Sequence, residues 1–126
     1  DVGTCVKFDL IGEQKNYIGG SISPGIKLRY KSLNDYTGNL PLISTKSKPN
    51  LLGNDTVSCI HSGVINGLQA EITTMILSYM KKFPNISFFV TGGDSSNFDY
   101  EIKNDIFVDS NLTLKGLYEI YKYNNA

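Results

Sequence analysis

Two segments, DVGTCVKFDLI (residues 1–11) and YIGGSIS (residues 17–23), decide how the fold begins. Apolar and polar side chains partly alternate over residues 5–11, as they do along a strand with one buried face. The intervening GEQKN (residues 12–16) has the composition of a turn. The sequence therefore predicts a β-hairpin. Because this hairpin starts at once and no initiator Met precedes it, we expect the chain to begin in the middle of a domain.

A helix of about 13 residues is predicted after the hairpin. Pro24-Gly25 ends the second strand, and Leu40-Pro41 ends the helix. Residues 44–50 read as a loop. The positions that recur at three- and four-residue intervals on one helical face are Ile26, Tyr30, Leu33, Thr37 and Leu40.

The longest predicted element is a second helix, over 56–83. Asn54 or Asp55 can cap its start, and Pro84 stops it. Its expected apolar stripe comprises Val57, Ile60, Val64, Leu68, Ile72, Met75, Tyr79 and Phe83.

Two glycines, Gly63 and Gly67, interrupt this helical pattern. Each weakens a helix by about 1 kcal/mol relative to Ala. Either they allow another element to pack closely, or they divide the helix in two.

The last third of the chain predicts a strand at 86–90 that ends in Thr91-Gly92-Gly93-Asp94. Glycine lets a backbone approach a ligand closely, so this pair is a candidate for nucleotide contact, although it is also an ordinary turn. A weak helix at 98–102, a strand at 106–109 and a final helix over 114–121 follow. The order of elements predicts an α/β domain whose mixed β-sheet is flanked by helices.

Composition sets limits on function. The 126 residues are 40% hydrophobic, which is enough for one domain with a core. Lys plus Arg and Asp plus Glu balance at 12 each, so a nucleic-acid partner is not expected. No apolar run is long enough for a membrane span, and we expect a cytoplasmic protein. Cys5 and Cys59 are expected to be small buried hydrophobic residues rather than a disulfide.

The stretch Asp1-Val2-Gly3-Thr4 combines a carboxylate that can hold a cation, a glycine that clears space and a hydroxyl that can bond a phosphate oxygen. Phosphoryl transfer depends mainly on such positioning and charge neutralisation. The same four residues are also compatible with a plain hairpin start.

Six sequence blocks occur in order along the chain. They are Asp1-Val2-Gly3-Thr4 with Asp9, YIGGSISPG (17–25), Leu33 with Leu40-Pro41, LGNDT (52–56) with Ser62-Gly63 and Gly67, Thr91-Gly92-Gly93, and NLTLKGL (111–117). Together they resemble the type III pantothenate kinases over essentially the whole chain. That resemblance implies ATP-dependent phosphorylation of pantothenate, the first step of coenzyme A synthesis. It also implies an actin-like architecture of two ribonuclease H-like lobes, of which residues 1–126 are the C-terminal one and the N-terminal lobe is absent.

The resemblance also implies roles for single residues. Asp1 matches the residue that binds a monovalent cation, K⁺ or NH₄⁺, and Gly3 and Thr4 match positions that bind ATP, supplied with Mg²⁺. Thr56 matches the threonine that contacts pantothenate. Gly92 and Gly93 stand where the backbone comes near the nucleotide.

Some positions depart from the family pattern or have no role in it. Cys5 and Lys7 replace the usual Ala and Thr, and Lys7 either adds positive charge toward phosphate or faces solvent. Asp9 has either a polar role near the phosphates or a structural one. His61 is expected to serve packing or the surface.

The catalytic Asp base and a substrate Arg are expected in a segment upstream of Asp1. Residues 1–126 alone should therefore be inactive. A non-catalytic binding or regulatory module of the same fold is the alternative.

A homodimer is also implied by the resemblance. The long helix carries apolar residues off its main stripe, and a second buried face would explain them. These residues are Ile65, Leu77 and Met80.

Overall fold

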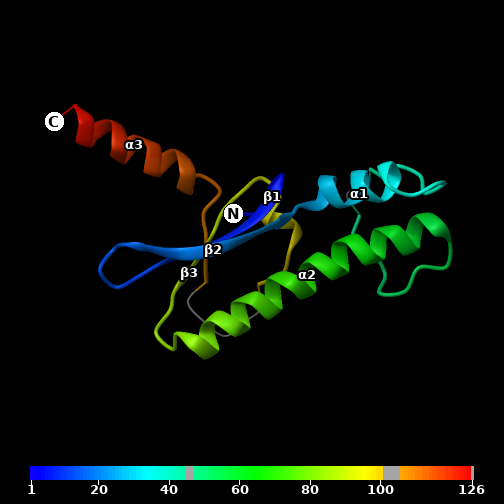
Figure 1. Ribbon diagram of the computed structural model, residues 1–126, viewed down its shortest axis with the longest axis horizontal. Helices are drawn as coiled ribbons and strands as arrows, with labels where there is room; N and C mark the ends of the chain where they lie inside the picture. Colours follow the sequence, from blue (N-terminus) through cyan, green and yellow to red (C-terminus); the bar gives the residue numbers. More distant parts are fainter. Residues whose placement is uncertain (45–46, 101–105, 126) are drawn as a thin grey trace.

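The computed structural model describes residues 1–44, 47–100 and 106–125. Figure 1 shows a strand hairpin, one long helix beneath it, and a final helix that carries the C-terminus away from the rest. The elements in order are β1 (Cys5–Ile11), β2 (Tyr17–Pro24), α1 (Ile26–Asp35), α2 (Thr56–Lys82), β3 (Phe88–Val90), η1 (Ser95–Asn97), β4 (Ile106–Val108) and α3 (Leu112–Asn124).

The predicted hairpin is confirmed. β1 and β2 pair antiparallel from Cys5 opposite Pro24 to Ile11 opposite Tyr17, with a shift in register after Leu10. Gly20 is required inside β2, because a Cβ there would collide with the carbonyl oxygen of Phe8 across the pair.

The expected single mixed sheet is not what the described residues form. β1 and β2 make one two-stranded sheet, and β3 and β4 make a second, parallel one. Val2 connects the two, because its N–H donates to the carbonyl oxygen of Thr91 at 2.7 Å while Val2 also bridges to Val6. The α/β class is therefore confirmed, and the strands are divided differently from the prediction.

The long helix α2 supplies most of the core. Asp55 caps it in a capping box: its side chain accepts from the Ser58 N–H at 2.8 Å, and the Ser58 hydroxyl accepts from the Asp55 N–H. The main hydrophobic cluster joins α2 to β1, β3 and the N-terminal residues. It consists of Val2, Val6, Leu68, Ile72, Ile76, Val90 and Phe98. A second cluster, formed by Tyr30, Ile43, Ile60 and Val64, joins α2 to α1.

The prediction that Gly63 and Gly67 divide the helix in two is wrong, because α2 is continuous over 27 residues. Both glycines are exposed, and among the described residues no atom of another element lies within 4 Å of where a Cβ would stand at either one. The close packing of another element is therefore not seen in this part of the chain. The apolar stripe also differs from the prediction at two positions, since Ile76 is buried where Met75 was expected and Val57 is exposed.

Several smaller predictions need correction. α1 has 10 residues and ends at Asp35. The Tyr36 N–H makes the last helical bond, to Ser32, and the Leu33 carbonyl oxygen then accepts from the Thr37 hydroxyl. In place of a helix at 98–102 there is the short η1; residues 101 and 102 lie outside the described residues. Cys59 is exposed and Cys5 half-buried, and both are free thiols.

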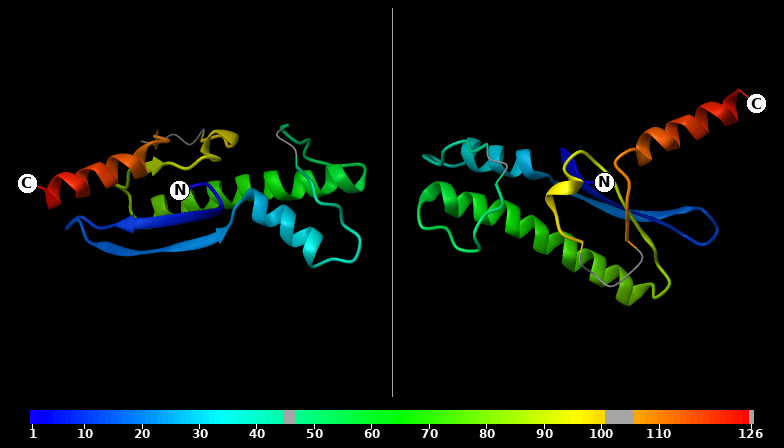
Figure 2. Two further views of the ribbon diagram at one scale, coloured as in Figure 1. Left: turned by 90° about the horizontal axis from the view of Figure 1, so that it is seen from above. Right: turned by 180° about the vertical axis from the view of Figure 1, so that it is seen from behind.

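The final helix α3 forms as predicted, but none of its residues is buried. Both views in Figure 2 show it extending away from α1 toward the C-terminus. Even α2, the longest described helix, is too polar to qualify as a membrane span.

Candidate functional site

The backbone brings the N-terminal residues and the Gly92-Gly93 turn into one corner of the molecule. Besides the bond from Val2 to Thr91, the Asp94 N–H donates to the carbonyl oxygen of Val2 at 2.9 Å. Gly92 has φ of +104°, and a Cβ there would collide with the Val2 carbonyl and stand 2.6 Å from Asp1 Oδ1. Gly92 is therefore needed for this close approach of two chain segments.

The Gly3-Thr4 turn is packed from behind and open in front. The N–H of Gly25 donates to the Thr4 carbonyl oxygen at 3.0 Å, and a Cβ at Gly25 would collide with the Gly3 carbonyl. A Cβ at Gly3 would meet only Asp1 Oδ1, at 3.8 Å, and the Thr4 side chain is exposed. A ligand can thus approach the Gly3 backbone and the Thr4 hydroxyl from one side.

A polar network behind this turn holds it against α2. Glu71 of α2 accepts hydrogen bonds from Ser23 and from Arg29, with which it also forms an ion pair. The Arg29 Nε donates to the carbonyl oxygen of Pro24 at 2.8 Å, next to Gly25. Sequence reasoning missed this network, because nothing in the local pattern couples residue 71 to the end of β2.

Gly93 faces open space, since no atom of the described residues lies within 4 Å of where its Cβ would stand. It borders a groove of about 870 Å³ between α1, α2 and the turn after β3. The lining includes the charged and amide side chains of Lys27, Asp94 and Asn97, which suit a polar ligand.

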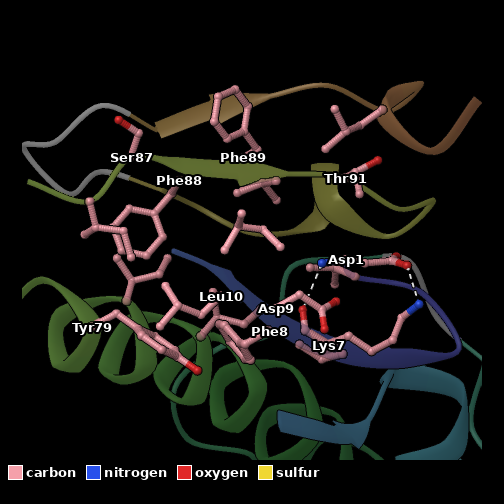
Figure 3. Close-up of a pocket in the computed structure, with 18 of the residues that line it drawn as sticks. Asp1, Lys7, Phe8, Asp9, Leu10, Tyr79, Ser87, Phe88, Phe89 and Thr91 are labelled. Atoms are coloured by element: carbon pink, nitrogen blue, oxygen red, sulfur yellow. Dashed lines mark hydrogen bonds and ion pairs between the residues drawn. The ribbon is translucent and has the colours of Figure 1, made fainter. Parts of the chain in front are cut away.

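Asp1 is engaged by Lys7. The two residues exchange backbone hydrogen bonds at 2.9 Å each, and the Lys7 Nζ lies 2.8 Å from Asp1 Oδ2, as Figure 3 shows. Lys7 therefore does not simply face solvent, and the exposed Asp9 stands next along the same strand face. Among the described residues no three His, Cys, Asp or Glu side chains cluster as a metal site.

Beside this pair lies an apolar groove of about 690 Å³ between β1 and β3. Figure 3 shows Phe8 and Leu10 on one side of it, Phe88 on the other, and Tyr79 of α2 beneath. Thr91, at one end, has a buried hydroxyl without a hydrogen-bond partner among the described residues. Such a buried hydroxyl normally has a partner in a folded protein.

Thr56 is not part of the Asp1 corner. It is the first residue of α2 and is exposed, and α2 starts beside α1, at the opposite end of the molecule from α3 (Figure 1). Its neighbour Asp55 has a pKa below the ordinary value, because Ser58 donates hydrogen bonds to the ionised carboxylate.

His61 serves packing, as predicted. It is buried on α2, where Nδ1 lies 2.6 Å from the Tyr30 hydroxyl and Nε2 lies 2.8 Å from the Ser47 carbonyl oxygen. Burial raises the pKa of Tyr30, so this phenol stays neutral and available as a hydrogen-bond donor.

Comparison with known proteins shows which family the chain resembles. The family model described as type III pantothenate kinase matches residues 1–78. Type III pantothenate kinase of Christiangramia forsetii is 46% identical over 126 residues, which are 100% of this chain and 52% of that protein. The enzyme of Flavobacterium johnsoniae is 43% identical over 98% of this chain and 50% of its own length. The chain thus spans about half the length of these relatives.

A solved structure has a similar fold. A crystal structure from Campylobacter jejuni, named for the Baf family of transcriptional activators, has a TM-score of 0.66 and 21% identity. The match covers 98% of this chain and 56% of the other. At this identity the match shows the fold alone.

Proposed function

The chain belongs to the type III pantothenate kinase family, and we propose that the longer protein to which it contributes transfers the γ-phosphoryl group of ATP to pantothenate. This would be the first step of coenzyme A synthesis. The observation that carries the proposal is the corner where the open Gly3-Thr4 turn meets Gly92 and Gly93. The Gly3 N–H already donates to the Cys5 carbonyl oxygen at 3.0 Å, so the Thr4 hydroxyl is the donor for a phosphate oxygen there, and Gly3 leaves room for the phosphate.

In this proposal the ATP phosphates lie against Gly3 and the Thr4 hydroxyl, and the nucleoside extends past Gly93 into the polar groove. Glu71, through Arg29, keeps the supporting turn in place. Positioning of this kind accounts for much of phosphoryl-transfer catalysis. The base that takes the hydroxyl proton of pantothenate is expected in the upstream segment, so residues 1–126 alone should not catalyse the reaction.

Mg²⁺ is implied by the use of ATP. It usually keeps several waters and is held by one or two carboxylates together with substrate phosphates. The half-buried Asp94, which lines the polar groove proposed for the nucleoside, fits this mode, and no cluster of protein ligands for a metal is found among the described residues. When bound, Mg²⁺ neutralises charge that develops on the phosphates.

The predicted monovalent cation at Asp1 fits the described residues less well. One oxygen of this carboxylate already receives the Lys7 ammonium at 2.8 Å. We therefore derive no step through a free cation at this position.

We further propose that residues 1–126 form one ribonuclease H-like lobe of an actin-like kinase and that the residues just before Asp1 form a strand in the apolar groove. Asp1 already pairs with Lys7, and Val2 with Thr91, so the preceding residues would run between β1 and β3. Phe8, Ile72 and Ile76 line the groove, so such a strand would be apolar on the face toward α2.

Amide hydrogen exchange on the full-length protein tests this strand. Because Lys7 bonds to Asp1, strand alternation turns the N–H of Asp9 toward the groove and that of Phe8 toward β2. We expect both amides to exchange slowly. Fast exchange at Asp9 with slow exchange at Phe8 would show that nothing pairs with this edge of β1.

We also propose a homodimer. The burial of the three residues off the main stripe of α2 indicates which of them can be tested as part of an interface. Ile65 and Met80 pack against the two core clusters, so they are not a second external face. Leu77 alone of the three is exposed, at 49%. Leu77→Glu should convert the full-length protein to a monomer by sedimentation if α2 forms the interface; an unchanged dimer mass would place the interface elsewhere.

The central experiment is a kinase assay on the full-length protein that follows 4′-phosphopantothenate by mass spectrometry. Thr4→Val should raise the KM for ATP more than that for pantothenate, because the lost hydroxyl faces the phosphates. Val fills similar space, so the fold is kept. Absence of product from the unmodified protein would refute the kinase and favour a non-catalytic module.

A further inference from the structure

The ion pair between Asp1 and Lys7 lies where the resemblance predicts a monovalent cation. The Lys7 Nζ is 2.8 Å from Asp1 Oδ2, a normal distance for a charge-assisted hydrogen bond. An ammonium group carries the same single charge as K⁺ or NH₄⁺. The carboxylate therefore already has a cationic partner that is part of the chain.

The backbone fixes this partner in place. Asp1 and Lys7 face each other as a hydrogen-bonded pair, which puts their side chains on the same face. The pair is only partly buried, with side-chain exposures of 31% and 42%. Exposed ion pairs contribute about 0–1 kcal/mol, so stability alone gives little reason for this arrangement.

The pair also lies within reach of the proposed phosphate site. Asp1 Oδ1 lies 3.8 Å from the position that a Cβ would take at Gly3 and 2.6 Å from the position that a Cβ would take at Gly92. A free cation bound at Asp1 would meet the Lys7 ammonium at once, and the two like charges would compete for one carboxylate. Asp9 adds a second negative charge on this strand face and favours a cation there.

We propose that the Lys7 ammonium acts as a built-in monovalent cation beside Asp1, so that the protein binds its nucleotide phosphates without free K⁺ or NH₄⁺. This inference rests on the proposed function for the identity of the ligand. It makes Lys7 a specificity-determining residue, because it sets which ions the protein requires.

The test compares ATP binding by the full-length protein in KCl and in choline chloride at equal ionic strength, with Mg²⁺ present and pantothenate absent. Calorimetry gives the affinity, and the melting temperature is a second readout. We expect the unmodified protein to behave alike in both salts. Lys7→Met should bind ATP about tenfold more weakly in choline, since a hydrogen-bonded charge is lost. KCl or NH₄Cl should restore its affinity and raise its melting temperature.

Lys122→Met is the matched control, because it removes a lysine whose ion pair with Glu119, at 2.6 Å, is local to α3. It should show no dependence on the salt. If Lys7→Met does not fold, Lys7→Thr replaces it as a smaller side chain. A difference in ATP affinity of the unmodified protein between the two salts would still overturn the inference.

Two results would overturn the inference: a several-fold gain in affinity of the unmodified protein in KCl, or a Lys7→Met protein unchanged in both salts. Failure of the unmodified protein to bind ATP in either salt would refute the proposed function as well. Normal ATP binding without pantothenate phosphorylation would refute the proposed reaction only, because affinity and melting temperature are measured without pantothenate.

Discussion

The corner proposed for ATP and the region of Thr56, which the resemblance assigns to pantothenate, differ in how tightly they are packed. In the ATP corner, the Gly92 backbone packs closely against Asp1 and Val2, and Val2 belongs to the main core cluster. In the second region, Thr56 is exposed at the start of α2, and Leu51 and Leu52, shortly before it in sequence, are 79% and 83% exposed. Substitution at Gly92 therefore alters fold and site together, whereas a substitution at Thr56 can alter the site alone.

The largest effect is expected for Gly92→Val. The new side chain would collide with the Val2 carbonyl and would require a β-branched residue at φ of +104°. We expect the full-length protein to lose cooperative thermal unfolding, rather than to lose ATP binding while it stays folded. A folded Gly92→Val protein would show that the two segments can separate without loss of the core.

Gly93→Val sharpens the contrast within the same turn. In the part of the chain that the structure describes, no atom lies within 4 Å of the new Cβ, and φ at Gly93 is not positive, so the melting temperature should hardly change. If the nucleotide passes close to this backbone, ATP affinity by calorimetry should fall by about tenfold or more. Unchanged affinity would remove Gly93 from the nucleotide site.

These two glycines show where sequence reasoning reaches its limit. The hairpin and α2 could be predicted, because alternation and helical periodicity are local properties of the chain. The need for glycine at position 92 could not be predicted, because the Val2 carbonyl that a Cβ would strike is 90 residues away in sequence. The pairing of Asp1 with Lys7 depends likewise on how residues 1–3 fold back on β1.

The helix α3 illustrates the same limit. Its apolar face was predicted correctly, yet Leu117 and Tyr121 remain 58% and 62% exposed. Periodicity indicates which face of a helix is apolar but not what covers it. In a chain that spans half the length of its relatives, we propose that this partner belongs to the other half.

Thr56→Val tests the open region. The residue is exposed, and Val keeps the size of the side chain, so folding should not change. A neutral hydrogen bond contributes about 0.5–1.5 kcal/mol, which corresponds to a roughly two- to twelvefold rise in the KM for pantothenate. The KM for ATP should stay within error. Equal changes in both would mean that Thr56 contacts neither substrate selectively.

The smallest effect is expected next to it, at Asp55, and depends on pH. Hydrogen bonds from Ser58 hold the pKa of Asp55 below its ordinary value of 3.8. A carboxylate with a lowered pKa stabilises the folded state above 3.8, and that contribution is lost as the pH falls through the folded-state pKa. Asp55→Asn keeps a cap acceptor but cannot titrate. The difference in melting temperature between the two full-length proteins should therefore be small and constant from pH 7 to about 5 and shrink below the ordinary pKa of Asp. A difference in melting temperature that stays constant down to acid pH would mean that the charge of Asp55 does not contribute to the cap. The start of α2 would then be held by Ser58 and by the close packing of Gly53, where the Ser58-Cys59 backbone leaves no room for a Cβ.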